Sequence, residues 1–243
     1  LNEKFSFFLK NCEGKAPIKL FYSKNNSENT FEVTGQANIQ ELYAELKFLG
    51  IKHSYQSGLI DFNITSNYDD FTEAEISLVN ESIDMFLAYK KNNKNQKFFL
   101  EHLKSELHDF SLTYEMDDSK KSLLIEGKKI NIDNFFKDIS HKDFTLQRNK
   151  TIEFDFLIEE LFVNNNLIKN PIFSGLIKDN GFERLDVELN ASDFNHKVII
   201  FKNDFEKQIK ILSDNATDFL KYFDINANTK NGKLLVEGKK KRK

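Results

Sequence analysis

Tryptophan is absent from this sequence of 243 residues, and cysteine occurs once, at Cys12. A single cysteine excludes an internal disulfide framework. Proline occurs twice and glycine nine times, which excludes collagen-like and linker-like chains. No apolar run reaches the roughly 18 residues that a transmembrane helix needs, so none is predicted. The net charge of −3 does not favour a nucleic-acid-binding protein.

Phenylalanine is abundant, with 25 copies, and lysine greatly outnumbers arginine. Phenylalanine, lysine, asparagine and isoleucine are all read from A/T-rich codons, so their number alone says little about function. Their placement carries the information.

Apolar residues recur at every second position in many short segments, which is the pattern of strands with one apolar face. The segment IEFDFLI at 152–158 places apolar side chains on one face and acidic ones on the other. The same alternation occurs at 18–22, 60–64, 185–189, 198–200 and 209–211, and at 112–114 with a returning strand at 122–125. Within 112–125, the polar sequence MDDSK predicts a hairpin turn.

Helical patterns are few and short. The segments 131–139 and 214–224 predict short helices, the second with an N-cap among Ser213, Asp214 and Asn215. The segment 39–50 fits either a helix or a strand. The segment 81–110 is ambiguous, although KKNNKNQ at its centre predicts a turn.

A weak internal echo relates two segments. SLLIEGKK at 122–129 returns as KLLVEGKK at 233–240. In both, an apolar strand is predicted to end at Glu-Gly, before the lysines. A repeated unit of this kind favours an extended, modular β architecture.

Three further stretches carry a resemblance to a known family. They are GKKINIDNFF at 127–136, IEFDFLIEELFVNNNLIKNPIFSG at 152–175 and ILSDNATDFLKYFDINANTKNGKLLVEG at 211–238, and the upstream segment GQANIQELYAELKFLGIKHS at 35–54 is similar to a related motif. Together with LDVELNA at 185–191, they resemble motifs of AsmA-like proteins, nearest to the YhdP- and TamB-type group of bacterial envelope proteins. The resemblance covers most of residues 30–238 and looks like a C-terminal-type portion. It departs at Asn231-Gly232, where the family often has a glycine pair.

The resemblance implies a mainly β fold: an extended, twisted antiparallel sheet shaped as a half-pipe or groove, with a few short helices. We expect one elongated region over 1–243, with sub-modules 1–121 and 122–238 and a basic tail at 239–243. The tail is predicted to be a solvated, disordered end, with docking to phosphate groups as the alternative.

The function implied is non-enzymatic: an apolar groove for phospholipid acyl chains, serving inter-membrane lipid transport and outer-membrane homeostasis. The expected partners are acyl chains, inner- and outer-membrane surfaces and envelope proteins, without nucleic acid. The expected location is the periplasm, with membrane association through a part of the protein outside this chain. The alternative function is a β-rich interaction or scaffold module whose apolar face is fully buried and whose basic tail docks a partner.

The predicted groove lining consists of alternating apolar residues on three predicted strands. These residues are Ile152, Phe154, Phe156, Ile158, Leu185, Val187, Leu189, Ile209 and Ile211. An ordinary β core would show the same alternation, and the resemblance favours the groove.

No catalytic or cofactor site is predicted. His102, Glu106, His108 and Asp109 cluster in sequence, but no single backbone conformation gathers them as a zinc site requires. Cys12 has no histidine near it in sequence, and nucleotide-binding or nucleophile motifs are absent. Adjacent carboxylates such as Asp117-Asp118 point apart in strands or face solvent in turns.

Overall fold

The described part of the chain consists almost entirely of strands. The computed structural model describes residues 9–27, 29–46, 51–54, 56–67, 71–132, 151–163, 166–178, 181–191, 194–202, 206–222 and 232–241. Within these ranges, most strands follow the alternation of apolar and polar residues read from the sequence.

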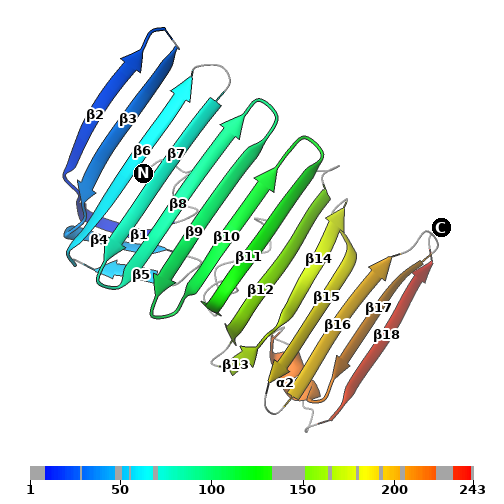
Figure 1. Ribbon diagram of the computed structural model, residues 1–243. Helices are drawn as coiled ribbons and strands as arrows, with labels where there is room; N and C mark the ends of the chain where they lie inside the picture. Colours follow the sequence, from blue (N-terminus) through cyan, green and yellow to red (C-terminus); the bar gives the residue numbers. More distant parts are fainter. Residues whose placement is uncertain are drawn as a thin grey trace.

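The main sheet has fifteen strands, and fourteen of them lie on one path (Figure 1). In path order they are β2 (Ile18–Asn25), β3 (Thr30–Asn38), β6 (Gly58–Asn67), β7 (Phe71–Asn80), β8 (Ile83–Asn92), β9 (Gln96–Ser105), β10 (Asp109–Met116), β11 (Lys120–Asn131), β12 (Thr151–Val163), β14 (Ile172–Lys178), β15 (Gly181–Ala191), β16 (Phe194–Lys202), β17 (Glu206–Ser213) and β18 (Leu234–Lys241). The short strand β13 (Asn166–Lys169) pairs with β12 off this path.

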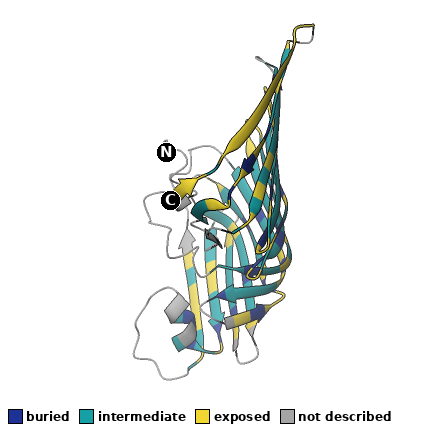
Figure 2. Cartoon of the chain, turned by 90° about the vertical axis from the view of Figure 1, so that its left-hand side faces the viewer, coloured by how far each residue is buried: buried dark blue, intermediate teal, exposed yellow. Residues whose placement is uncertain are grey.

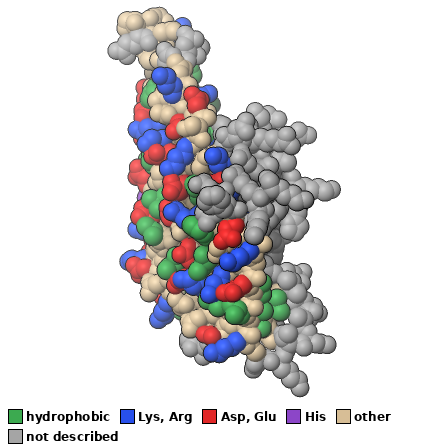
Figure 3. All heavy atoms as spheres, turned by 90° about the vertical axis from the view of Figure 1, so that its right-hand side faces the viewer, with side chains coloured by type: hydrophobic (Ala, Val, Ile, Leu, Met, Phe, Trp, Pro, Cys, Tyr) green, Lys and Arg blue, Asp and Glu red, His purple; other side chains and the backbone are tan. Residues whose placement is uncertain are grey.

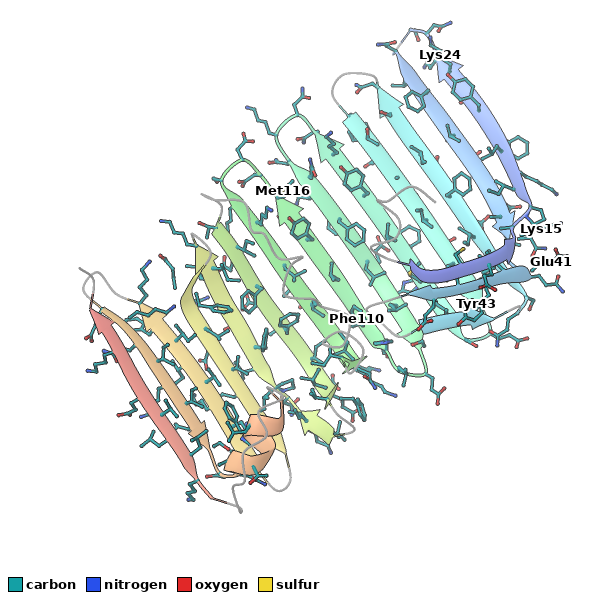
Figure 4. The ribbon with its side chains drawn as sticks, turned by 180° about the vertical axis from the view of Figure 1, so that it is seen from behind. Lys15, Lys24, Glu41, Tyr43, Phe110 and Met116 are labelled. Atoms are coloured by element: carbon teal, nitrogen blue, oxygen red, sulfur yellow. The ribbon has the colours of Figure 1, made fainter. Side chains whose placement is uncertain are left out.

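Two smaller elements lie against one face of the main sheet, seen from behind in Figure 4. One is a three-stranded sheet of β1 (Leu9–Lys15), β4 (Glu41–Leu46) and β5 (Ile51–Ser54). The other is helix α2 (Ala216–Tyr222). We call the face that carries them the inner face and the opposite face the outer face. The upper end of the sheet is the end that carries the β2–β3, β8–β9 and β10–β11 turns.

The main sheet is twisted and open. Its first and last strands, β2 and β18, each have one neighbour among the described strands. The sheet curves so that the inner face is concave (Figure 2). The chain therefore spreads its strands along a curved sheet instead of closing them around one core.

Asparagine and aspartate side chains shape the turns between strands. In five turns, a side-chain Oδ1 accepts a hydrogen bond from the backbone N–H two residues later, at 2.7–3.1 Å. The acceptors are Asn25, Asn38, Asn80, Asn92 and Asp117. Such bonds mimic a backbone turn, so part of the high asparagine content has a structural use.

The buried core lies at the lower end of the inner face. Ile39, Leu103 and Phe110 there are 1%, 0% and 4% exposed. Ile39 comes from the segment between β3 and β4, and its backbone N–H donates to the carbonyl oxygen of Gly58 at 3.1 Å. Leu42 of β4 packs against the same cluster. The small sheet therefore covers the lower end of the inner face.

The mainly β fold is confirmed, as are the hairpin turn in MDDSK and the turn in KKNNKNQ, between β8 and β9. The predicted helix at 214–224 is present as α2. Of the two alternatives for 39–50, the described part is the strand β4. The predicted helix at 131–139 lies outside the described residues from 133 onward.

Three expectations need correction. All neighbouring strands of the main sheet are antiparallel except β11 and β12, which are parallel. Alternation is the same in both kinds of pair, so it could not reveal this. The strands of the echo do not end at Glu-Gly, because β11 continues to Asn131 and β18 to Lys241. Lys239 to Lys241 are thus in a strand, ordered by pairing with β17, and not in a disordered tail. The boundary between the predicted sub-modules 1–121 and 122–238 falls inside β11, and that division stays a prediction.

Candidate functional site

Two rows of residues cross the whole inner face in register. In each row, every residue is paired with its neighbour on the next strand. The first row is Tyr22, Val33, Ile64, Ala74, Tyr89, Phe98, Tyr114, Leu123, Phe154, Gly175, Leu185, Ile200, Ile209 and Gly238. The second is Leu20, Gly35, Phe62, Ile76, Leu87, Leu100, Leu112, Ile125, Phe156, Phe173, Val187, Val198, Ile211 and Val236.

We call these two rows the apolar strip. No charged side chain interrupts it, and its only hydroxyl groups belong to three tyrosines. Neighbouring strands lie about 4.8 Å apart, so thirteen spacings give a strip about 60 Å long. The strip depends on the register of the strands, because a shift of one residue on any strand would move the apolar side chains of that strand to the outer face.

The strip differs in exposure along the sheet. Phe154 and Val187 are buried. In the middle of the strip, Tyr89, Phe98, Tyr114 and Leu123 of the first row are half-buried, whereas Leu100 and Ile125 of the second row are buried in the cluster that contains Ile39. The described elements in front of this face, the small sheet and α2, lie at its lower end (Figure 4). Figure 4 also marks the ends of β10, with Phe110 at the covered lower end and Met116 at the upper end.

An aromatic cluster forms the middle of the C-terminal half of the strip. The ring of Phe154 has its centroid 5.5 Å from that of Phe173 and 6.4 Å from that of Phe182. The rings of Phe156 and Phe173 are 4.8 Å apart. These separations fall in the range of favourable aromatic pairs, so the cluster is a packed apolar surface.

Glycines make room for phenylalanine rings on this face. Gly35 is paired with Phe62 and Gly175 with Phe154. A Cβ atom placed on Gly35 would lie 2.5 Å from the ring of Phe62, and one on Gly175 would lie 2.4 Å from the ring of Phe154. Each phenylalanine ring therefore packs directly over the backbone of a glycine, in the space that a side chain would otherwise occupy.

The outer face carries the charges, interspersed with uncharged side chains (Figure 3). Ion pairs link neighbouring strands there: Nζ of Lys90 is 2.5 Å from Glu73, Nζ of Lys97 is 2.6 Å from Glu115, and Nζ of Lys120 is 2.5 Å from Glu153. The hydrogen bond from Lys120 holds the pKa of Glu153 below its usual value, and the hydrogen bond to Glu73 raises the pKa of Lys90. The charged side chains of the outer face thus form ion pairs with one another. The phenol of Tyr114, on the inner face, has its pKa raised by burial, in keeping with apolar surroundings.

The row above the strip, at the upper end of the inner face, is polar on several strands. Between β6 and β11 it consists of Ser66, Thr72, Lys91, Gln96, Met116 and Lys121, paired in that order. We call this row the upper rim. Within the part of the chain that the structure describes, neither Lys91 nor Lys121 forms an ion pair.

All nine residues predicted to line a groove lie on the inner face. All nine lie in or directly above or below the apolar strip on β12, β15 and β17, with Leu189 directly below Val187 and paired with His196. The structure brings them together through β14 and β16, which supply Phe173, Val198 and Ile200. Their role in binding lipid stays a prediction.

Sequence reasoning missed the N-terminal half of the strip. Phe62, Tyr89, Phe98 and Tyr114 belong to it as fully as Phe154 does. The signal was available, because 60–64 and 112–125 show the same alternation as 152–158.

The histidines of the sequence cluster are separated by the fold. Nε2 of His102 lies 2.9 Å from Oδ1 of Asp84, whereas His108 is fully buried beside Phe110. Within the described ranges, no group of three or more histidine, cysteine, aspartate or glutamate side chains is placed to hold a metal ion. Among the same residues, no helix has the length and apolar character to cross a membrane.

Comparison with known proteins returns no match: no family model, no curated protein and no solved structure is similar to this chain.

Proposed function

We propose that this chain binds phospholipid acyl chains along the apolar strip, as a non-enzymatic segment of an AsmA-like envelope protein that takes part in lipid transport between membranes. The observation that carries the proposal is the strip itself: two adjacent rows, apolar or glycine at every position, across fourteen strands.

A long apolar strip suits a hydrocarbon chain better than a folded partner. Each buried methylene contributes about 0.8 kcal/mol of favourable transfer, and an acyl chain has no polar group that needs a partner. An unsatisfied polar atom against such a surface would cost about 1–3 kcal/mol. The strip offers continuous contact and few hydrogen-bonding groups, which is what an acyl chain requires.

The length of the strip also fits. Half of the hydrocarbon core of a bilayer is about 15 Å thick, so the strip of about 60 Å is several acyl chains long. The sub-cellular setting, the periplasm, follows from the family resemblance alone and is part of the proposal.

The test uses neighbouring residues that face opposite ways on the same strands. Phe98 and Leu123 are in the strip, while Phe99 and Leu124 are the next residues along β9 and β11 and face outward. All four are half-buried. We would titrate a fluorescent fatty acid into wild type, Phe98→Gln/Leu123→Gln and Phe99→Gln/Leu124→Gln.

The proposal requires that wild type binds the probe, that the inner pair of substitutions weakens binding at least about tenfold, and that the outer pair leaves it nearly unchanged. Far-UV circular dichroism confirms that each variant keeps its β structure. Absence of binding by folded wild type, or equal loss in both variants, would overturn the proposal in favour of an interaction module with a closed apolar face.

A further inference from the structure

The upper rim places two lysines beside the apolar strip. Lys91 of β8 and Lys121 of β11 are on the inner face, because each pairs within the row that contains Gln96 and Met116. One row below them lie Tyr89 and Leu123 of the strip. Their sequence neighbours Lys90 and Lys120 point to the outer face, where they pair with Glu73 and Glu153.

The contrast between neighbours is informative. The outward lysine of each pair has a carboxylate partner at 2.5 Å. The inward lysine of each pair has no ion-pair partner among the described residues, and no aspartate or glutamate is found in the upper rim between Ser66 and Lys121. Positive charge therefore stands uncompensated along one border of an apolar surface.

We propose that Lys91 and Lys121 bind the phosphate of lipid headgroups whose acyl chains lie on the strip. This inference rests on the proposed function and adds the headgroup chemistry and the orientation of the lipid. The phosphate is at the upper rim, and the acyl chain runs down the strands toward the small sheet.

The dimensions fit this orientation. On β8, Lys91 of the rim comes six positions after Met85 of the buried end, which is about 20 Å of strand. Half of a bilayer's hydrocarbon core is about 15 Å. Lys91 and Lys121 are three strand spacings apart, about 14 Å, so each serves a separate headgroup.

The experiment compares two fluorescent lipids with identical acyl chains, phosphatidic acid and diacylglycerol, which differ by the phosphate. Wild type should bind phosphatidic acid about two- to fivefold more tightly at low salt, as one exposed charge contact for each headgroup allows. The preference should shrink as salt rises. Lys91→Gln/Lys121→Gln should lose the preference and bind diacylglycerol as wild type does, while the outward control Lys90→Gln/Lys120→Gln should keep it.

Each outcome is decisive. Equal binding of the two lipids by wild type, or a preserved preference in the inward variant, overturns the role of the rim while leaving the strip in place. Failure of wild type to bind either lipid overturns both this inference and the proposed function. Competition by inorganic phosphate as strong as competition by unlabelled phosphatidic acid would show that the lysines bind free phosphate with no help from the acyl chain, and would also overturn it.

Discussion

The backbone at Gly175 leaves no room for a side chain. A Cβ atom there would lie 2.4 Å from Cζ of Phe154 and 3.0 Å from the carbonyl oxygen of Arg184. Phe154 is held by Phe156, Phe173 and Phe182 around it. Because the ring is packed on several sides, it cannot move away freely.

Gly175→Ala should therefore destabilise the protein by about 1–3 kcal/mol, the usual cost of overpacking. Urea denaturation would measure it. Gly238→Ala is the matched control, since it lies in the same row with no atom within 4 Å of its added Cβ, and it should be neutral or slightly stabilising. Replacing the ring as well, in Gly175→Ala/Phe154→Leu, should cost less than the sum of the single changes. Simple additivity would contradict the clash.

Asp117 stabilises the β10–β11 turn by accepting three hydrogen bonds. Its Oδ1 accepts from the backbone N–H of Ser119 and of Lys120, both at 2.7 Å, and from the hydroxyl of Ser119 at 2.9 Å. The hydrogen bond from the backbone N–H of Lys120, followed by the bonds from Ser119, holds the pKa of Asp117 below its usual value. The ionised form is thus favoured by folding.

This direction fixes the sign of a pH effect. A carboxyl group whose pKa is lowered in the folded state contributes stability that is present above its unfolded pKa and lost as pH falls through the folded one. Wild type should lose stability relative to Asp117→Asn as pH drops below about 4, because asparagine keeps the Oδ1 acceptor without titrating. The free energy of unfolding of both proteins would be measured between about pH 6 and about pH 3, the range around the pKa of aspartate. If the two proteins lost stability in parallel over this range, the role assigned to the carboxylate would be wrong.

Helix α2 shows how an element too short to persist alone is held by the sheet. Isolated helices of seven residues are not stable in water. Phe219 is 5% exposed, and its ring centroid is 5.4 Å from that of His196 on β16. Ala216 donates its backbone N–H to the carbonyl oxygen of Gly232 at 2.7 Å. Contacts with the sheet, more than helix propensity, therefore set its stability.

Phe219→Ala should detach this helix locally, with a loss of about 3–5 kcal/mol for the contacts of a buried ring. Hydrogen exchange is the suitable measurement. We expect backbone amides of 216–222 to lose protection while those of β7 to β10 keep it. If the distant strands lost protection to the same degree, α2 would have to be part of one cooperative unit with the whole sheet.

The features of the fold that depend on local sequence were predictable, and those that depend on contacts between distant segments were not. Alternation and turn chemistry are local, so the hairpins β8–β9 and β10–β11 and the inward set on β12 followed from the sequence. The parallel pairing of β11 with β12 and the second sheet depend on which distant segments meet, which a period of two does not encode. Lys91 and Lys121 were hidden for another reason: each sits in a run of two lysines, and only the register tells which one faces inward.

Across the whole molecule, the alternation of apolar and polar residues on each strand gives a sheet with an apolar inner face and a charged outer face over its full width. A closed β-sandwich would bury the inner face against a second sheet of similar size. The described second sheet has three strands against fifteen in the main sheet. It covers one end of the inner face, so the main sheet remains extended.

An extended sheet has a measurable size. A compact chain of this length has a radius of gyration of about 18 Å, and an unfolded one about 54 Å. The strip alone is about 60 Å long. Small-angle X-ray scattering should therefore give a radius of gyration clearly above about 18 Å and far below about 54 Å, with a pair-distance distribution skewed to long distances. The same sample should show β-dominated circular dichroism, which separates extension from unfolding. A radius near the compact value would mean that the sheet closes in solution, and the strip would then be a core with no room for acyl chains.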